Sequence, residues 1–461
     1  MGLLEHMFKN DHLVFLDAAS GKKRTLQEML FPLEEIGKMS KKLAFLYLNG
    51  DSISTATYLS FLGTQHATVL LSDALEPILK ENLESEYQPT IIFDASRNHI
   101  KSYQQKKLAN EWSEIALFID TGKETKVHAN CKVLLSTSGT TGSPKFVKLS
   151  EKNLLENAKS ICAYLPIVKT DVVPLNLSLF YSYGLSILHT NALAGGTVVS
   201  GVSDILQKDF WIQMDSHGFT SMAGVPFIYE MLYRIGFLKK KYPSLRYISQ
   251  AGGNLSQNIK KNFNDYCIEN NIAFYVMYGQ TEASARISYV PAEVLEKKIT
   301  SIGRPIKNGE LSLDPETGEL LYSGPNVFGG YSIKREDLKT WEKIEPLRTG
   351  DLAYQDEDGF YFIKGRLKRF VKIFGNRVNL DELERFLKTT FNIGLVACIG
   401  VKDQFILVSH CEDDLLDEDI KKKLFERFKI HHASVKVKYL ESIPLTNNGK
   451  INYKKITAEY T

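Results

Sequence analysis

Residues 136–145, Ser-Thr-Ser-Gly-Thr-Thr-Gly-Ser-Pro-Lys, form a run of hydroxyl side chains and glycines between two apolar runs, residues 133–135 and 146–149. The flanking runs predict two strands joined by a tight connection inside a folded domain. The two glycines permit positive φ, so successive backbone N–H groups and hydroxyls can converge on one anion. Because Pro144 precedes Lys145 and no Ser or Thr follows it, the ending differs from that of a P-loop kinase or GTPase. We expect a phosphate cradle, and a Ser/Thr/Gly-rich surface linker is the alternative.

The composition limits the size of the fold and the class of partner. With 461 residues and 43% hydrophobic content, the chain can bury a large core and should form more than one domain. The formal net charge of +3 gives no electrostatic footprint for nucleic acid. The five cysteines are scattered without a Cys-x-x-Cys pair, which argues against a disulfide framework or structural zinc and indicates a reducing compartment. No signal peptide and no apolar run of membrane-spanning length is present, so we expect a cytoplasmic protein without a membrane span.

Short apolar runs alternate with segments of helical character ahead of residue 136. The runs rich in β-forming residues are 43–48, 68–71, 90–93 and 115–118. Alternating βα units of this kind predict a mostly parallel sheet with helices on both faces. Two helix starts carry capping residues. These are the turn at 49–52, ahead of a helix to Leu62, and Ser150, ahead of a helix to about Tyr164.

Three further motifs combine chemically reactive side chains with strand or turn signals. Residues 276–282 read Val-Met-Tyr-Gly-Gln-Thr-Glu, residues 348–354 read Arg-Thr-Gly-Asp-Leu-Ala-Tyr, and residues 443–450 read Ile-Pro-Leu-Thr-Asn-Asn-Gly-Lys. Each has a plain structural interpretation when taken alone. These interpretations are a strand-ending turn, an Asx turn at Asp351, and a solvated turn lysine at Lys450.

Residues 136–145 and these motifs, in this order, resemble the adenylate-forming superfamily, which includes acyl-CoA synthetases, luciferases and the adenylation domains of peptide synthetases. The resemblance covers most of the chain and implies an α/β fold in two parts. Residues 1–365 would form a large N-terminal domain of βα-layered sheets with a β-rich subdomain. Residues 366–461 would form a small, mobile α+β C-terminal domain with its hinge near Lys368.

The activity that the resemblance implies has two half-reactions. ATP would first activate a small carboxylic acid to acyl-AMP with release of pyrophosphate, in the presence of Mg²⁺. The acyl group would then pass to a thiol, as in an acyl-CoA synthetase. The acceptor would be CoA or the phosphopantetheine of an acyl carrier protein.

The resemblance also assigns residues that bind the nucleotide. Tyr278 would stack on adenine, Thr281 would donate to the α-phosphate, and Glu282 would hold Mg²⁺ directly or through water. Asp351 would accept hydrogen bonds from the two ribose hydroxyls. Lys450 would be the catalytic lysine that a mobile loop carries into the site. The other residues implied to bind ATP are Thr137, Ser138, Gly139, Thr140, Thr141, Gly142, Lys145, Gly252, Gly253, Asn254, Gly279 and Arg366.

The pocket for the acid and the path of the thiol are implied in the same way. Tyr181, Tyr183 and Gly184 belong to an aromatic run that borders the acid pocket in this superfamily. Amino-acid-activating members have an Asp at the position of Tyr181, and a buried ammonium without a carboxylate is costly, so an α-amino acid is disfavoured. Lys372, which we count with the catalytic residues, and Gly375 lie on the stretch that would enter the active site after the small domain rotates. Gly375 would border the thiol tunnel.

Two other functions stay open at this point. The chain could load a carrier protein instead of free CoA. It could also be a non-catalytic, nucleotide-binding relative that acts through a partner. That second alternative predicts the loss of Glu282, Asp351 or Lys450, and all three are present.

Overall fold

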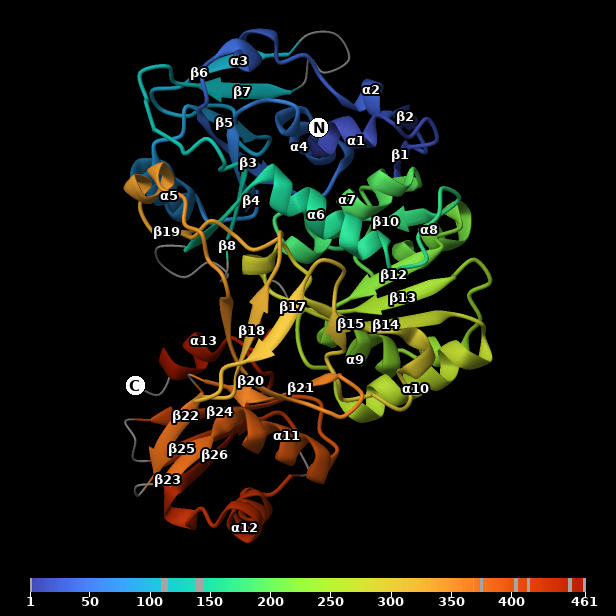
Figure 1. Cartoon of the computed structure of the whole chain (residues 1–461), viewed down its shortest axis with the longest axis vertical. Helices are drawn as coiled ribbons and strands as arrows, with labels where there is room; N and C mark the ends of the chain where they lie inside the picture. Colours follow the sequence, from blue (N-terminus) through green and yellow to red (C-terminus); the bar gives the residue numbers. More distant parts are fainter. Residues whose placement is uncertain are drawn as a thin grey trace.

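The computed structural model describes residues 2–108, 115–136, 145–367, 369–373, 376–401, 405–412, 415–446 and 450–458. The chain runs from a group of sheets and helices at the top of Figure 1 to a separate small group of strands and helices at the bottom. Within the described residues, no helix combines the length and the hydropathy needed to cross a membrane.

The largest described sheet is mixed. Its strands, in spatial order, are β19 (Tyr331–Ser332), β9 (Phe146–Leu149), β8 (Val133–Ser136), β4 (Ala67–Ser72), β3 (Leu43–Leu48), β5 (Ile91–Asp94), β7 (Ala116–Ile119) and β6 (Gln104–Lys107). The central pairs β8–β4, β4–β3 and β3–β5 are parallel, and the pairs toward both edges are antiparallel. The expected parallel pairing is confirmed for the runs at β3, β4 and β5 but not for the run at β7, which pairs antiparallel with β5, so the sheet as a whole is mixed. Parallel neighbours need a crossover of a dozen or more residues, whereas β8–β9 and β6–β7 are joined by shorter connections.

Helices cover both faces of this sheet, as expected. The odd-numbered residues of β3 pack in one core cluster with α5 (Pro77–Tyr87). The even-numbered residues pack in another cluster with α4 (Ser52–Leu62), α6 (Glu151–Cys162) and α7 (Ser182–Ala194). Successive strand residues point to opposite faces, so each face of β3 is buried by a different helix layer.

Both capped helices begin where the sequence indicates. Asp51 caps α4 by accepting a hydrogen bond from the backbone N–H of Ser54, at 2.6 Å. Ser150 caps α6 by accepting from the N–H of Asn153, at 3.1 Å. These side chains satisfy N–H groups that the first turn of a helix leaves without a backbone partner.

Two further sheets and their helices complete the upper and middle part of the molecule (Figure 1). One sheet has the order β10 (Val172–Pro174), β11 (Thr197–Ser200), β1 (Val14–Asp17) and β2 (Lys23–Thr25). The other has the order β12 (Ser221–Gly224), β13 (Tyr247–Gln250), β14 (Ala273–Tyr278), β15 (Ser288–Val290) and β16 (Arg304–Pro305). The remaining helices of this part are α1 (Leu3–Met7), α2 (Leu26–Met29), α3 (Glu34–Lys38), α8 (Lys208–His217), α9 (Pro226–Arg234) and α10 (Gln257–Glu269).

A β-rich unit follows, as the resemblance implies. Its strands are β17 (Glu310–Leu313), β18 (Glu319–Ser323), β20 (Leu347–Gln355) and β21 (Tyr361–Arg366). Asp351 lies inside β20, paired in register with Arg366 of β21. The Asx-turn alternative for Asp351 is therefore wrong, because the residue belongs to a strand.

The C-terminal residues form α+β structure with cores of their own. The strands are β22 (Phe370–Ile373), β23 (Asn376–Asn379), β24 (Val396–Val401), β25 (Phe405–His410) and β26 (Val435–Tyr439), and the helices are α11 (Leu380–Phe391), α12 (Asp417–Phe428) and α13 (Tyr453–Ala458). The two described core clusters of this part draw only on residues from 371 onward. The C-terminal residues thus bury apolar surface among themselves.

Candidate active site

Three residues from distant parts of the sequence meet where the ends of β14 and β21 reach the middle of β20. The Tyr278 hydroxyl donates a 2.5 Å hydrogen bond to Asp351 Oδ2, and Arg366 Nε lies 3.3 Å from Asp351 Oδ1. Burial raises the pKa of Asp351, while Arg366 and the Tyr278 hydroxyl act in the opposite direction. Asp351 is therefore a buried carboxylate held by one hydroxyl and one guanidinium.

Glu282 lies at a second corner of the site, on the short 3₁₀ turn η3 (Thr281–Ala283) that follows β14. Its Oε1 accepts a 2.7 Å hydrogen bond from the hydroxyl of Tyr331. The ammonium of Lys145 lies 3.2 Å from the centre of the Tyr331 ring. Tyr331 thus connects the C-terminal end of the 136–145 stretch to the Thr281–Glu282 turn.

Thr281 and the start of α7 are also close together. The hydroxyl of Thr281 lies 3.3 Å from that of Ser182, the first residue of α7. Ser182 is adjacent to Tyr181 and Tyr183 in the sequence. The turn at Thr281 and the aromatic run at 181–184 therefore border the same site.

Glycine is required at two of the expected positions. A Cβ at Gly279 would lie 1.8 Å from the carbonyl oxygen of Ala285, a backbone atom that cannot move aside. Gly252 has φ +86°, and a Cβ there would lie 2.5 Å from the Tyr181 hydroxyl. Positive φ favours glycine, and its absent side chain lets Tyr181 approach the backbone at the end of β13.

Gly184, Gly253 and Asn254 are the remaining positions of this group that the structure describes. A Cβ at Gly184 would lie 2.3 Å from the carbonyl oxygen of Ser178, so this glycine permits the close turn into α7. Gly253 and Asn254 are exposed just beyond β13. They directly follow Gly252 in the sequence.

Lys450 approaches this group from the C-terminal part of the chain. Its backbone N–H donates to the Thr446 hydroxyl at 3.2 Å, and its carbonyl accepts from the Thr446 N–H at 2.7 Å. The side chain is exposed, yet the surrounding protein lowers its pKa, and Arg366 adds to this lowering.

The carboxylates of the site oppose that change. Glu282 and Asp351 both raise the pKa of Lys450. Lys450 is therefore within the range of electrostatic interaction with both carboxylates.

Most residues of the expected phosphate cradle, the expected hinge and the expected thiol tunnel are not among the described ones. Thr137, Ser138, Gly139, Thr140, Thr141, Gly142, Lys368 and Gly375 lie outside the described residues. Lys372 lies on β22, but its side chain is also outside them.

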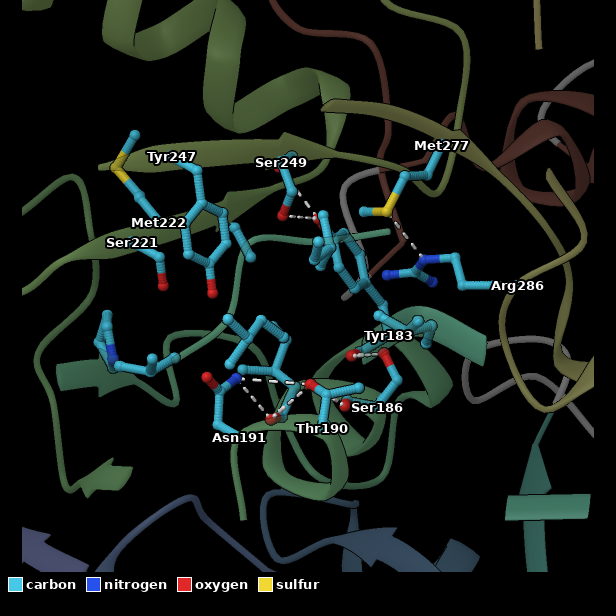
Figure 2. Close-up of a pocket in the computed structure, with 17 residues that line it drawn as sticks. Tyr183, Ser186, Thr190, Asn191, Ser221, Met222, Tyr247, Ser249, Met277 and Arg286 are labelled. Carbon is cyan, nitrogen blue, oxygen red and sulfur yellow. Dashed lines mark hydrogen bonds between the residues drawn. The ribbon is translucent and has the colours of Figure 1, made fainter. Parts of the chain in front are cut away.

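Three residues that the structure brings to the site or its border were not expected from the sequence. Tyr331 contacts Glu282, and Ser182 contacts Thr281. Arg286 lies in the wall of a nearby cavity (Figure 2). Tyr331 and Arg286 carried no local signal. Ser182 lies inside the aromatic run at 181–184, and its position in that run could have indicated a role.

The fold and the meeting of these motifs define a nucleotide-binding α/β protein whose candidate site lies between a large N-terminal part and a small C-terminal part. Residues 55–332 match the family model of the AMP-binding enzymes. Because this match spans more than half of the chain, the chain belongs to the AMP-binding enzyme family.

Individual relatives carry ligase names. The chain is 26% identical over 441 residues to a 2-succinylbenzoate–CoA ligase of Bacillus cereus (strain Q1), a match that covers 90% of this chain and 87% of that protein. It is 27% identical over 370 residues to an oxalate–CoA ligase of Arabidopsis thaliana, covering 74% of this chain and 70% of the relative.

A solved structure supports the fold. The o-succinylbenzoate CoA synthetase (MenE) from Bacillus subtilis, in complex with the acyl-adenylate intermediate OSB-AMP, superposes with a TM-score of 0.78 at 20% identity. The superposition covers 99% of this chain and 97% of that one. The α/β fold implied by the resemblance is therefore confirmed over nearly the whole chain.

Proposed function

We propose that this protein is an ATP-dependent acid–thiol ligase of the acyl-CoA synthetase type. The observation that carries the proposal is the meeting of Tyr278, Asp351 and Arg366, which come from three separate parts of the sequence. Family membership and the CoA-ligase names of the relatives support it. The alternative of a non-catalytic relative is disfavoured because the motif residues are present and also meet in one place.

The proposed first half-reaction is attack of the substrate carboxylate on the α-phosphate of ATP. Residues 137–142 and Lys145 would cradle the phosphates, and Thr281 would donate a hydrogen bond to the α-phosphate. Lys450 would stabilise the charge that develops on the α-phosphate and the leaving pyrophosphate. Such a phosphoryl-type transfer depends mainly on positioning and charge neutralisation, and these residues can provide both.

Glu282 fits the role of magnesium ligand. Tyr331 holds its Oε1, and Mg²⁺ is commonly bound by one or two carboxylates together with waters and substrate phosphates. No group of three or more His, Cys, Asp or Glu side chains that could hold a metal occurs among the residues that the structure describes. A single carboxylate completed by phosphate oxygens agrees with that finding. When bound, Mg²⁺ would neutralise charge on the phosphates.

Asp351 would hold the ribose, with Tyr278 against the adenine and Arg366 reaching the ribose or a phosphate. Replacing Asp351 with alanine is expected to weaken ATP binding by about 1.5–3 kcal/mol, the usual value of a hydrogen bond to a charged group. Isothermal titration of ATP measures this change. Asp358→Ala, on an exposed turn of the same β-rich unit, is the control. Unchanged ATP affinity in Asp351→Ala would refute the ribose assignment.

The proposed second half-reaction requires the small domain to rotate. We propose residues 1–365 and 366–461 as the two domains, which the separate C-terminal cores support. After rotation, Lys372 and Gly375 would line the path by which a thiol reaches the acyl adenylate. CoA is the proposed acceptor because the relatives are named CoA ligases, and the phosphopantetheine of a carrier protein is the alternative.

ATP–pyrophosphate exchange across a panel of carboxylic acids tests the first half-reaction. We expect exchange with simple or substituted carboxylic acids and none with α-amino acids. Burial raises the pKa of Tyr181 to about 12, so this side chain stays neutral and offers no charge to an ammonium. The control for each amino acid is its deaminated analogue. Faster exchange with any α-amino acid than with that analogue would contradict the assignment of Tyr181.

A further inference from the structure

A buried glutamate lies beside the segment that carries Asp351. Glu319 is the first residue of β18, and it is 2% exposed. Glutamate is almost never buried to this extent unless its carboxylate has partners. None of the roles proposed above uses Glu319, so the partners of its two oxygens indicate what it does.

The pairing between β18 and β20 is interrupted next to Glu319. Two pairs flank the interruption, Glu319 with Leu352 and Leu321 with Arg348. Between these pairs β18 has one residue, whereas β20 has three, residues 349–351. The three residues form a bulge, in which Gly350 has φ +76°. Bulges next to active sites commonly re-aim a side chain, and the side chain in this bulge is that of Asp351.

The bulge takes backbone groups out of the regular strand pairing, and side chains replace the missing partners. Oε1 of Glu319 accepts a 2.9 Å hydrogen bond from the N–H of Gly350. The Thr349 hydroxyl donates to the carbonyl of Leu320 at 2.7 Å and accepts from the N–H of Asp351 at 3.2 Å. Because a buried backbone group without a partner is costly, Glu319 stabilises this conformation of the bulge.

The second oxygen of Glu319 has a cationic partner. Nη2 of Arg348 lies 2.6 Å from Oε2 of Glu319 and 3.0 Å from Oδ2 of Asp314. A buried carboxylate without a counter-charge would be strongly destabilising. Arg348 supplies that charge at Oε2, so Oε1 is left to the N–H of Gly350.

The other side of the bulge is held by the end of β21. The carbonyl of Gly350 accepts a 2.7 Å hydrogen bond from the N–H of Leu367. Gly350 is thus bound through its N–H by Glu319 and through its carbonyl by Leu367. This double attachment fixes the backbone ahead of Asp351, whose carboxylate meets the Tyr278 hydroxyl.

We propose that Glu319 is a positioning residue for ribose recognition, because it holds the bulge that places the Asp351 carboxylate against the two ribose hydroxyls. In this role Glu319 acts through the N–H of Gly350 and does not contact the nucleotide. The inference rests on the proposed role of Asp351 and extends it to a second, buried carboxylate. The preference for a ribonucleotide over a 2′-deoxyribonucleotide therefore depends on Glu319.

Isothermal titration with ATP and with 2′-deoxy-ATP, both in the presence of Mg²⁺, measures that preference. The two nucleotides differ only in one ribose hydroxyl, which Asp351 would bind in ATP alone. We expect the wild type to bind ATP about 10- to 100-fold more tightly, the value of a hydrogen bond to a charged group expressed as a ratio of dissociation constants. A wild-type ratio of one would overturn the proposal, because there would be no ribose preference for Glu319 to support.

Substitutions at Glu319 then locate the origin of the preference. Glu319→Met has a similar length and offers Gly350 no oxygen, and Glu319→Asp keeps the charge but is one methylene shorter. We expect both variants to bring the ratio close to one, whereas Glu319→Gln, which keeps an acceptor oxygen of the same reach, should retain part of the preference. The control is Glu310→Met, the same substitution at an exposed position of β17, which should keep the full ratio.

The ratio separates positioning from a general structural role. An unchanged ratio in Glu319→Met or Glu319→Asp, even with weaker binding of both nucleotides, would overturn the proposal. Thermal unfolding shows which variants are folded. If Glu319→Met does not fold, Glu319→Asp decides, and failure of both to fold would assign the residue to stability alone and overturn the proposal.

The titration is also independent of the ligase function. It requires no acid and no turnover, so an absence of pyrophosphate exchange would refute the ligase function and leave the ratio of the two nucleotide affinities measurable. A ratio that falls in Glu319→Asp and partly returns in Glu319→Gln would support the proposal in either case.

Discussion

Replacing Lys450 with alanine is expected to slow ATP–pyrophosphate exchange by about 100- to 1,000-fold, the usual cost of losing one preorganised donor to a developing negative charge. The same variant should still convert a synthetic acyl adenylate to the thioester. The physical reason is the position of Lys450, whose ammonium is within electrostatic range of Glu282 and Asp351. There it can stabilise the α-phosphate only while the small domain occupies the arrangement described here.

The control for Lys450→Ala is Lys454→Ala, which removes an exposed lysine from α13 in the same segment. We expect this control to retain both half-reactions. If Lys450→Ala kept normal exchange, or if it lost both half-reactions to the same degree, the proposed role of Lys450 would be wrong.

The pH dependence of exchange gives a second measurement of the same prediction. The surrounding protein lowers the pKa of Lys450, so its ammonium loses its proton at a lower pH than an ordinary lysine. Wild-type exchange should therefore decline as the pH rises, beginning below the usual range for lysine. The Lys450→Ala variant has no ammonium that could lose a proton, so its residual exchange should not show this decline with pH.

Replacing Lys368 with proline is expected to have the opposite effect. Adenylation should continue, whereas thioester formation from a synthetic acyl adenylate should fall to background. Proline fixes φ near −65°, and a few backbone torsions at a domain boundary can carry a whole-domain rotation. Lys368 itself lies outside the described residues, but the residues around it indicate where such a boundary would fall.

The two neighbouring arginines bind to opposite sides of the proposed boundary. Arg366 pairs with Asp351 of β20, on the N-terminal side. Arg369 pairs with Asp381 at 2.7 Å and with Glu384 at 2.5 Å, both on α11 of the C-terminal side. A rotation at Lys368 could therefore leave both ion pairs intact, while it would break the 2.9 Å hydrogen bond from the backbone N–H of Arg366 to Asp381 Oδ2.

The measurements for this variant are pyrophosphate exchange and thioester release from synthetic adenylate. The matched control is Lys368→Ala, which removes the same side chain and leaves φ free. A proline at Lys364 would not serve as a control, because that residue lies within β21. If Lys368→Pro and Lys450→Ala lost the same half-reaction, the two-conformation mechanism would not apply to this protein. The proposed function would then be limited to formation of the adenylate.

The sequence determined those features that depend on neighbouring residues. The caps at Asp51 and Ser150, the strands that flank residues 136–145, and the motifs that contain Thr281, Asp351 and Lys450 were all identified from patterns within a few residues. A cap is made with residues of the same turn, and a strand is indicated by its own apolar run. Because these motifs are short and specific, they also indicated the superfamily, which the family match confirms.

The tertiary structure decided what depends on residues far apart in the chain. The hydrogen bond between Tyr278 and Asp351 joins residues 73 positions apart, and that between Tyr331 and Glu282 joins residues 49 positions apart. The mixed order of the largest sheet and the burial of Arg286 against Tyr183 were likewise not predicted. Sheet order and burial follow from how whole segments pack against one another, and that packing selects the partner of a side chain only after the complete chain has folded.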